Sequence, residues 1–220
     1  MKDLTLVIPA KNESECLPIV LESLRKFDCK IIVSLQEDDL PTINSIKDQN
    51  VTIIKQTKRG YGNALTEGIN ACETKFFCIF NADGSFDEND LYKMYELNMK
   101  NDFVFTSRYQ LNGGSDDDTF VTYIGNQIFS TLGLLLYSLK IDDILYTYLM
   151  GKTESFKKLD IKKDDFRFCV ELPIKMKKKG MLYTLIPSHE KSRIAGIKKV
   201  NAFKDGFLIL KEMITLFFLK

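Results

Sequence analysis

Short apolar segments alternate with amphipathic segments along the first half of the chain, and this alternation constrains the fold more than any other feature. The apolar segments are rich in β-branched and aromatic residues, which predicts strands at Leu4–Ile8, Lys30–Leu35, Val51–Ile54, Phe76–Phe80 and Asp102–Thr106. Segments with helical spacing lie between them, at Leu17–Phe27, Thr42–Asp48, Gly60–Asn70 and Asp87–Asn101. Such alternation forms βαβ units with right-handed crossovers, so the sequence predicts an α/β fold with a mostly parallel central sheet.

The alternation ends near Gln110. A polar, glycine-containing loop follows at Asn112–Asp118, then an apolar helix, a polar connection, a lysine-rich helix and a late strand at Met181–Ile186. The chain has 220 residues, no internal repeat and no low-complexity linker, so we expect a single domain over residues 1–220. Residues 1–110 are expected to form a nucleotide-binding type of half, and residues 111–220 a different half.

Composition disfavours several classes of protein. The formal net charge is only +1, so a nucleic-acid partner that depends on bulk positive charge is not expected. That charge is unevenly divided, because residues 1–150 carry 14 Lys and Arg against 22 Asp and Glu, whereas residues 151–220 carry 17 against 8. The basic part is expected to meet phosphates and anionic lipid. Five scattered cysteines without a C-x-x-C pair disfavour a disulfide framework or a zinc knuckle, and favour a reducing cytoplasm.

Two apolar segments raise the question of membrane contact. Ile128–Leu139 and Phe207–Leu219 are both shorter than the ~20 residues that a transmembrane helix requires, and charged residues end or interrupt them. The N-terminus also lacks the long apolar core of a secretory signal. We therefore expect a cytoplasmic protein whose two apolar helices either pack internally or lie in the interface at the inner face of a membrane.

Three polar clusters follow predicted strands, at Pro9–Glu13, Gln36–Asp39 and Asn81–Ser85. In an open α/β sheet, ligands bind beyond the carboxyl ends of the strands, so these clusters are expected to converge on one site. An acid on a turn after a buried strand suits a hard cation with oxygen ligands, and such a cation would neutralise a diphosphate leaving group. An ordinary turn explains Asn81–Ser85 about equally well, because all of its residue types favour turns.

Other polar segments carry weaker signals. Lys58–Ala64 joins a basic pair to a glycine-rich helix start, which suits an anion, although a flexible turn would be commoner. His189 is the only histidine, so a histidine-based metal site is excluded on number and a solvated loop residue is expected. The acidic trio Asp116–Asp118 is expected to be a solvated loop.

Taken together, several motifs resemble the family-2 glycosyltransferases of the GT-A fold, particularly the branch that resembles dolichyl- or polyprenyl-phosphate mannosyltransferases. They occur in family order over nearly the whole chain, which is more specific than any one motif. The matching segments are LTLVIPAKNE (4–13), KRGYGNALTEGI (58–69), FFCIFNADGSFDENDL (76–91), TSRYQLNGG (106–114), GNQIFSTL (125–132), ELPIKMKKKG (171–180) and SRIAGIKKV (192–200). The resemblance implies a three-layer, Rossmann-like sandwich, with residues 1–110 binding a nucleotide sugar and residues 111–220 facing the acceptor.

The resemblance also implies roles for individual residues. Those that would bind the nucleotide sugar are Pro9, Ala10, Lys11, Glu13, Lys58, Arg59, Gly60, Arg193 and Lys198. Those that would hold Mg²⁺ or Mn²⁺ are Asn81, Asp83 and Ser85. Asp83 and Glu171 would be catalytic, and Arg108 and Thr122 would meet the acceptor. A helix-surface acid paired with Lys175 at i+4 is the competing interpretation of Glu171.

The chain departs from the family pattern at three positions. Gln36–Asp39 replaces the usual D-D-G-S turn, which leaves the donor base open. Asn81 replaces the first acid of the metal motif, and Asp118 stands where the branch carries an arginine before its S-x-x-x-N segment. These departures weaken the case for a lipid-phosphate acceptor and leave metal choice open.

The implied reaction transfers a hexose from a nucleotide diphosphate sugar, with inversion, to a polyprenyl-phosphate or glycan acceptor. The metal and the basic loop Arg193–Lys198 would stabilise the departing diphosphate. An ionised phosphate acceptor needs no base, whereas a sugar hydroxyl needs a carboxylate such as Glu171. Two alternatives remain: a non-catalytic or altered-specificity homologue, and a sugar nucleotidyltransferase, which would require a glycine- and arginine-rich loop after the first strand.

Overall fold

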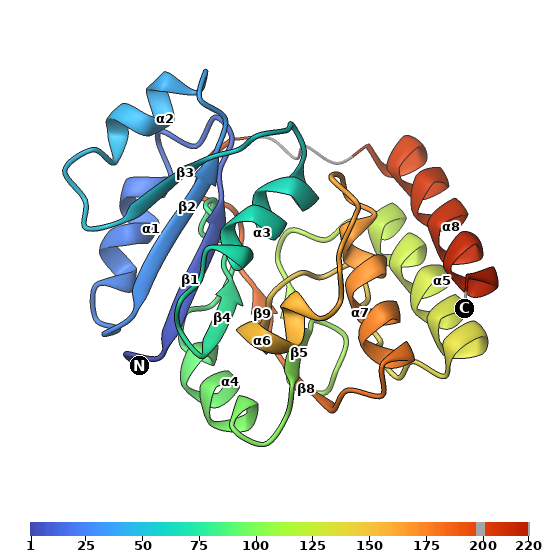
Figure 1. Cartoon of the computed structure of the whole chain (residues 1–220). Coiled ribbons are helices and arrows are strands. Elements are labelled where there is room, and N and C mark those ends of the chain that lie inside the picture. Colours follow the sequence, from blue (N-terminus) through green and yellow to red (C-terminus); the bar gives the residue numbers. More distant parts are fainter. Residues whose placement is uncertain (197–200, 220) are drawn as a thin grey trace.

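A seven-stranded sheet forms the centre of the computed structural model, which describes residues 1–196 and 201–219 (Figure 1). The strand order is β3-β2-β1-β4-β7-β5-β8. The bounds of these strands are β1 Leu4–Pro9, β2 Lys30–Leu35, β3 Thr52–Lys55, β4 Phe76–Ile79, β5 Phe103–Ser107, β7 Leu149–Lys152 and β8 Tyr183–Pro187. A separate parallel ribbon joins β6 (Gly114–Ser115) to β9 (His189–Glu190).

The sheet is parallel except at β7. β1 lies between β2 and β4 and pairs in parallel with both, and β5 pairs in parallel with β8. β7 is antiparallel to both of its neighbours, β4 and β5. β7 lies in the segment that the sequence predicts to be a polar connection between two helices. Its four residues, with a glycine at the third position, have no strand periodicity and therefore give no signal for a strand. β5 lies between β7 and β8, so residues 1–110 and 111–220 contribute to one sheet.

Eight helices accompany the strands in the described part of the chain. Their bounds are α1 Leu17–Leu24, α2 Leu40–Ser45, α3 Tyr61–Asn70, α4 Asp90–Asn98, α5 Phe120–Tyr137, α6 Thr153–Lys157, α7 Phe168–Lys178 and α8 Ala202–Phe218. α2 begins two residues earlier than predicted, because the buried Asp39 caps it and Pro41 is compatible with the first helical turn. Within the described residues no helix is long and apolar enough to cross a membrane.

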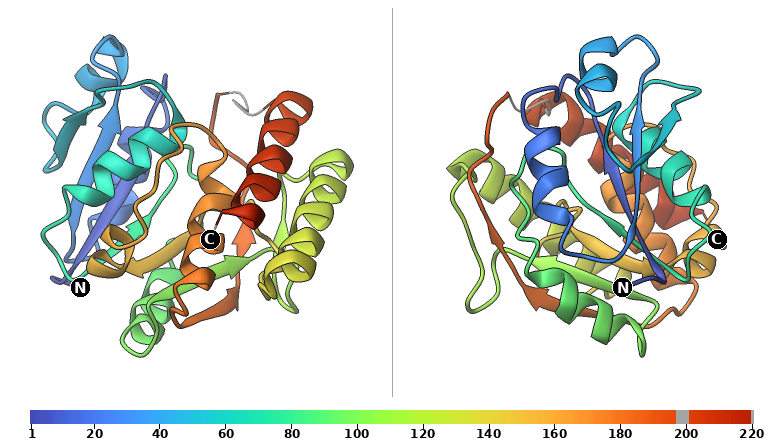
Figure 2. Two further views of the ribbon diagram at one scale, coloured as in Figure 1. Left: turned by 45° about the vertical axis from the view of Figure 1, so that its right-hand side comes forward. Right: turned by 90° about the vertical axis from the view of Figure 1, so that its left-hand side faces the viewer.

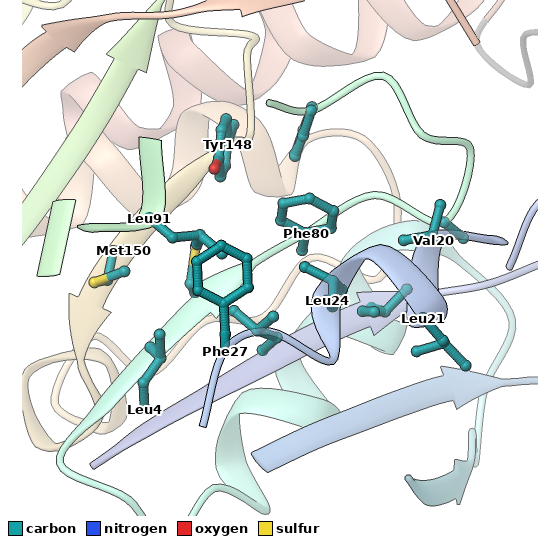
Figure 3. Packing of buried hydrophobic residues seen from close by; sticks show 14 of the residues in the cluster. Leu4, Val20, Leu21, Leu24, Phe27, Phe80, Leu91, Tyr148 and Met150 are labelled. Carbon is teal, nitrogen blue, oxygen red and sulfur yellow. The ribbon is translucent and has the colours of Figure 1, made fainter. Parts of the chain in front are cut away.

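Alternate side chains of β1 enter two separate cores. Leu4, Leu6 and Ile8 pack on one face of the sheet with the apolar sides of α1 and α4 (Figure 3). Val7 packs on the other face with α3, and α6, α7 and α8 extend that second core. Both faces of the central strands are therefore buried, which explains their nearly continuous apolar sequences. The predicted α/β fold, with a mostly parallel sheet between two helical layers, is confirmed.

The two helical glycines Gly62 and Gly125 allow a matched test of this packing. A Cβ atom on Gly62 would lie 2.3 Å from the Lys163 carbonyl oxygen, whereas a Cβ atom on Gly125 would meet nothing within 4 Å. We expect Gly62→Ala to lower the free energy of unfolding by about 1–3 kcal/mol through overpacking. Gly125→Ala should raise it by about 0.5–1 kcal/mol through helix propensity.

Urea denaturation of the two variants beside the wild type measures both changes. Equal effects from the two substitutions would contradict the close approach of α3 to residues 163–165.

Candidate active site

The loops after β1 and β2 are held together at the carboxyl edge of the sheet. Asp39 is 7% exposed, and its Oδ2 accepts a hydrogen bond of 2.7 Å from the backbone N–H of Asn12. The backbone N–H of Glu13 donates to Thr42 Oγ1 at 2.9 Å. Asp39 also caps α2, so one carboxylate fixes the predicted nucleotide loop, residues 9–13, to the cluster after β2. Ala10 and Glu13 are buried, Pro9 is half-buried and Lys11 is exposed.

A third loop crosses the turn that follows β4. The backbone N–H groups of Lys191 and Ile194 donate to the carbonyl oxygens of Ser85 and Asp83 at 2.8 and 2.9 Å. Gly84 has a φ of +80°, and a Cβ atom there would lie 2.5 Å from the Ile194 side chain. The turn therefore requires a glycine both for its backbone and for the close approach of residues 191–196, which we call the late loop.

Arg193 on the late loop lies between two carboxylates. Its Nη1 is 3.7 Å from Asp83 Oδ2, and its Nη2 donates to Asp117 Oδ2 at 3.0 Å. Burial alone would lower the pKa of Arg193, but the hydrogen bond that it donates to Asp117 and the charges of Asp83, Asp117 and Glu13 outweigh burial and raise it. A fixed cation therefore lies beside the predicted metal-binding acid.

The acidic trio Asp116–Asp118 is a solvated loop only at Asp116, whose side chain is 53% exposed, whereas Asp117 and Asp118 are half-buried and contribute to this site. The ribbon of β6 and β9 carries the trio to the late loop, where Asp116 pairs with His189 at 2.9 Å and Asp117 pairs with Arg193. Asp118 accepts from the Tyr109 hydroxyl at 2.7 Å. Residues about 75 positions apart are joined by a two-residue ribbon, and so short a ribbon leaves no periodic signal in the sequence.

Asn81, Asp83 and Ser85 offer a donor set that suits a hard cation. Asp83 Oδ1 accepts from the Ser85 backbone N–H at 3.0 Å, and Asn81 Nδ2 is 3.4 Å from Ser85 Oγ. One carboxylate with neutral oxygen donors fits Mg²⁺ or Mn²⁺ when phosphate oxygens and water supply the remaining ligands. In the described parts of the chain, no group of three or more His, Cys, Asp or Glu side chains forms a complete metal cage.

A small pocket separates the nucleotide loop from the late loop. Its volume is about 160 Å³, and it is lined by residues 12–16, Ala195 and Gly196. Sites for small molecules usually measure about 300–1,000 Å³, so a nucleotide sugar needs more room than the late loop leaves here. Lys198, the last predicted donor-binding residue, lies outside the described residues.

The basic pair Lys58 and Arg59 is exposed at the same edge of the sheet. Arg59 pairs with Asp38 at 2.6 Å and Lys58 pairs with Asp164 at 3.5 Å. Gly60 precedes α3 with a φ of +137°, and the Asp164 carbonyl oxygen would lie 1.9 Å from a Cβ atom there. The same carbonyl accepts from the backbone N–H of Asn63 at 3.0 Å. The close contact with the backbone at Asp164 therefore explains why residue 60 is a glycine. The sequence pattern alone suggests an anion site at this helix start.

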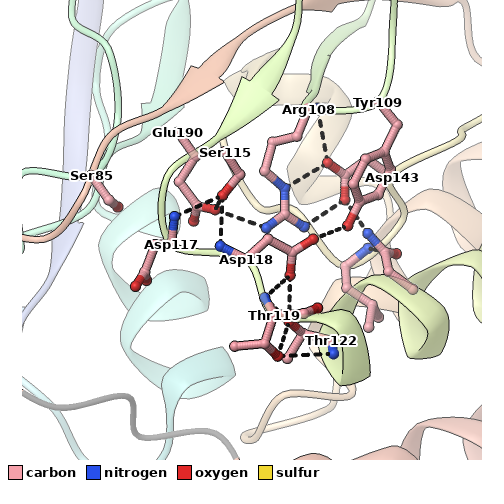
Figure 4. Close-up of polar contacts among 12 residues, drawn as sticks. Ser85, Arg108, Tyr109, Ser115, Asp117, Asp118, Thr119, Thr122, Asp143 and Glu190 are labelled. Carbon is pink, nitrogen blue, oxygen red and sulfur yellow. Dashed lines mark hydrogen bonds and ion pairs between the residues drawn. The ribbon is translucent and has the colours of Figure 1, made fainter.

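Arg108 lies in a buried ionic network rather than in an open acceptor site (Figure 4). Its Nε and Nη2 donate to the two oxygens of Asp143 at 2.8 Å each, and its Nη1 donates to Glu190 at 2.9 Å. The guanidinium also lies 4.5 Å from the centre of the Tyr146 ring. Burial would lower the pKa of Arg108, but the hydrogen bonds and charge of Asp143, with the charge of Glu190, raise it. All of its guanidinium nitrogens are engaged within the protein.

Thr122 is the third residue of a capping box that begins α5. The Thr119 hydroxyl accepts from the Thr122 backbone N–H, and the Thr122 hydroxyl accepts from the Thr119 backbone N–H. The Thr122 hydroxyl also donates to Asp118. In the structure, Thr122 therefore stabilises the N-terminus of α5, which begins directly after the acidic trio.

Glu171 is not available to an acceptor, although sequence analysis assigned it a catalytic role. It is 1% exposed, and its oxygens accept from the backbone N–H groups of Lys162 and Lys163 at 2.8–3.1 Å. Lys175 Nζ lies 2.6 Å from Oε1, which is the i+4 pairing that the competing interpretation predicted. The carboxylate therefore fixes residues 162–163, whose neighbour Asp164 contacts the start of α3.

Comparison with known sequences gives a family match and several relatives. The sequence model described as glycosyl transferase family 2 matches residues 5–160. An uncharacterized glycosyltransferase of Mycobacterium tuberculosis is 32% identical over 111 residues, which is 50% of this chain and 50% of that protein. The chain thus spans about half the length of this relative. Glycosyltransferase AglJ of Haloferax volcanii is 23% identical over 94% of this chain and 70% of its own length.

Solved structures share the fold. Glucosyl-3-phosphoglycerate synthase from Mycobacterium tuberculosis, solved with Mn²⁺, UDP and glucosyl-3-phosphoglycerate, superposes with a TM-score of 0.75 at 11% identity, over 99% of this chain and 80% of that one. Mannosyl-3-phosphoglycerate synthase from Rubrobacter xylanophilus gives 0.72 at 13% identity, over 97% and 72%. The three-layer sandwich is therefore of the GT-A type. None of these proteins is named as a polyprenyl-phosphate mannosyltransferase, so that branch stays a hypothesis.

The Arg108 network predicts a large difference between buried and exposed ion pairs. Asp143→Asn leaves the Arg108 guanidinium buried with one carboxylate fewer, and should lower the free energy of unfolding by about 3–5 kcal/mol. Asp38→Asn removes the partner of the exposed Arg59 and should cost less than about 1 kcal/mol. Chemical denaturation measures both, and a cost for Asp143→Asn as small as that for Asp38→Asn would contradict the network.

Proposed function

The chain belongs to glycosyl transferase family 2, and from this premise we propose that it transfers a hexose from a nucleotide diphosphate sugar to a polyprenyl-phosphate or glycan acceptor, with inversion at the anomeric carbon. The observation that carries the proposal is the convergence of the nucleotide loop, the turn after β4 and the late loop at one edge of the sheet. Asp83 and Arg193 lie 3.7 Å apart at that point.

The donor is proposed to bind between the nucleotide loop and the late loop. The small pocket already separates these two segments, and its walls include the backbone of residues 12–16. Backbone groups at the carboxyl end of β1, with Glu13, would meet the base and ribose. Lys58 and Arg59 are exposed at the same edge and pair only with exposed acids, so both cations can turn toward the nucleotide at small cost.

Arg193 is proposed to stabilise the departing diphosphate. Its guanidinium is held by Asp117 and lies beside Asp83, and a positioned cation is most effective where negative charge develops during the reaction. Asp117 is then a positioning residue, since it orients Arg193 and does not itself meet the reacting atoms. Lys198, which lies outside the described residues, is proposed from the sequence to bind the donor as well.

Asn81, Asp83 and Ser85 are proposed to hold a divalent cation, Mg²⁺ or Mn²⁺. When bound, that cation would neutralise charge on the diphosphate. Asp83 is the only carboxylate of this turn, so the bound diphosphate must contribute ligands of its own. The mycobacterial synthase was solved with both Mn²⁺ and UDP, which supports the expectation that metal and nucleotide bind together.

The acceptor is proposed to carry a phosphate. Glu171 is buried and engaged with the chain, so it supplies no proton acceptor for a sugar hydroxyl. An ionised phosphate attacks without a base, which makes such an acceptor compatible with this site. The phosphoglycerate named for the similar synthases is likewise a phosphorylated compound. Arg108 is proposed to support the acceptor side indirectly, by fixing Asp143 and Glu190 below the acidic trio.

A nucleotidyltransferase explains the site less well. That chemistry favours a glycine- and arginine-rich loop after the first strand, and residues 10–15 contain neither residue type. A non-catalytic homologue remains the second candidate, because Asn81 replaces an acid in the metal motif. Measured turnover distinguishes it from the proposed enzyme.

Substitution of Asp83 and Arg193 tests the proposed reaction. We expect Asp83→Ala to reduce release of nucleoside diphosphate from the preferred donor by about 100-fold or more, because it removes the one carboxylate of the metal turn. Arg193→Gln should reduce it by about 100- to 1,000-fold, because it removes a cation from the leaving group. Release is measured over a panel of UDP- and GDP-sugars with Mn²⁺ or Mg²⁺.

Asp28→Ala is the matched control. Asp28 is an exposed acid at the opposite edge of the sheet, just before β2, and its removal should change the rate by less than about twofold. Absence of turnover with every donor, together with absence of metal-dependent nucleotide binding, would leave the non-catalytic homologue as the better account.

A further inference from the structure

The C-terminal helix α8 carries apolar residues both on the side that enters the core and on a side that is exposed. Ile209, Met213 and Leu216 point into the second core. Phe203, Phe207, Leu210, Ile214 and Phe217 recur every three or four residues on the other side, and they are between 37% and 87% exposed. Exposed apolar residues at this spacing form one continuous stripe along the helix.

Helix α5 lies beside α8 and adds a second stripe. Both helices lie side by side at the same end of the molecule in Figure 1 and in the left view of Figure 2. Phe120, Ile124, Ile128 and Leu135 of α5 are between 40% and 79% exposed. Of the 18 residues of α5 none is charged. Exposed apolar residues gathered on two neighbouring helices mark an interaction site.

The outer stripes are not needed to hold the two helices in place. Phe129 of α5 packs against Gly206 of α8, and the Tyr137 hydroxyl donates to the Met213 carbonyl oxygen. Lys178 of α7 donates to the carbonyl oxygens of Leu216 and Leu219 at the end of α8. The fold therefore fixes α8 through its inner side and leaves the outer side exposed.

The exposed charge on these two helices is mostly positive. Lys204 and Lys211 of α8 are exposed and form no ion pair with any described residue. The acids of α8 are occupied, because Asp205 accepts from the backbone N–H of Asn201 and the buried Glu212 pairs with Lys163 at 3.1 Å. An apolar stripe accompanied by unpaired lysines has the composition of a helix that lies in the interface of an anionic bilayer.

We propose that the outer face of α5 and α8 docks on an anionic lipid bilayer, with the phenylalanines inserted among the acyl chains and the lysines at the headgroups. A second copy of the chain fits the face less well, because these two helices offer its lysines no free acid: α5 carries no charge and both acids of α8 are engaged.

The docking face begins at the candidate active site. Phe120 follows Asp117, the partner of Arg193, by three residues, and the Tyr109 ring contacts the Tyr123 ring of α5 with centroids 5.1 Å apart. A docked molecule would hold this edge of the sheet near the headgroups, where a lipid-borne phosphate is presented. This consequence for the acceptor rests on the proposed function, whereas the docking itself does not.

Vesicle flotation of the whole chain, with neither donor nor acceptor present, tests the docking directly. The wild type should float with vesicles of phosphatidylcholine and phosphatidylglycerol, and less with phosphatidylcholine alone. Phe203→Glu with Phe207→Glu, and separately Phe120→Glu with Leu135→Glu, should each reduce the bound fraction by about tenfold or more. These side chains are 68–87% exposed, so the variants should fold, and circular dichroism checks this.

Leu182→Glu is the control, because Leu182 is 63% exposed and belongs to neither helix, since it directly precedes β8. Wild type that stays unbound with both kinds of vesicle would overturn the proposal, as would equal loss of binding in the control. Concentration-dependent dimers that both double variants abolish, without vesicle binding, would assign the face to a second copy. Because no substrate is present, failure here is distinct from failure of the proposed reaction.

Discussion

The parallel pairing of β1 with β2 and β4 is the constraint on which the rest of the molecule depends. Parallel strands bring their carboxyl ends to the same edge, so the loops that follow these three strands must meet there. The two buried faces of the sheet leave little room for polar groups elsewhere in it. The polar loops therefore lie at this edge. Asp39 joins the loop after β2 to the loop after β1, because it accepts a hydrogen bond from the backbone N–H of Asn12.

The second part of the chain contributes most of the charged residues that form ion pairs near that edge. The antiparallel β7 and the parallel β8 extend the sheet, and the ribbon of β6 and β9 then carries the acidic trio to the late loop. Arg108 lies under this assembly between Asp143 and Glu190, and Arg193 lies above it between Asp83 and Asp117. Arg108 is thus part of the buried framework, with all three guanidinium nitrogens engaged. Arg193 is the arginine that we propose to act on the leaving diphosphate.

Most of the fold and part of the site could be predicted from the sequence. Strand and helix alternation predicts the parallel strands, and polar clusters after strands predict the convergence of Pro9–Glu13, Gln36–Asp39 and Asn81–Ser85. The short strand β7, the two-residue ribbon and the role of Asp117 have no local signal, because each arises from pairing between distant segments. Glu171 shows a different limit. The family motif suggests a catalytic acid and the helical spacing predicts its pairing with Lys175, but the burial of its carboxylate against two backbone N–H groups is seen only in the structure.

We propose that the edge formed by the nucleotide loop, the turn after β4 and the late loop binds a nucleotide diphosphate together with a divalent cation. Calorimetric titration of UDP and GDP, with Mn²⁺ and after its removal by a chelator, measures this binding. We expect saturable binding of at least one nucleotide, strengthened about tenfold or more by the metal, since one carboxylate and the diphosphate must share it. If neither nucleotide binds in the presence of metal, this edge is not a nucleotide site.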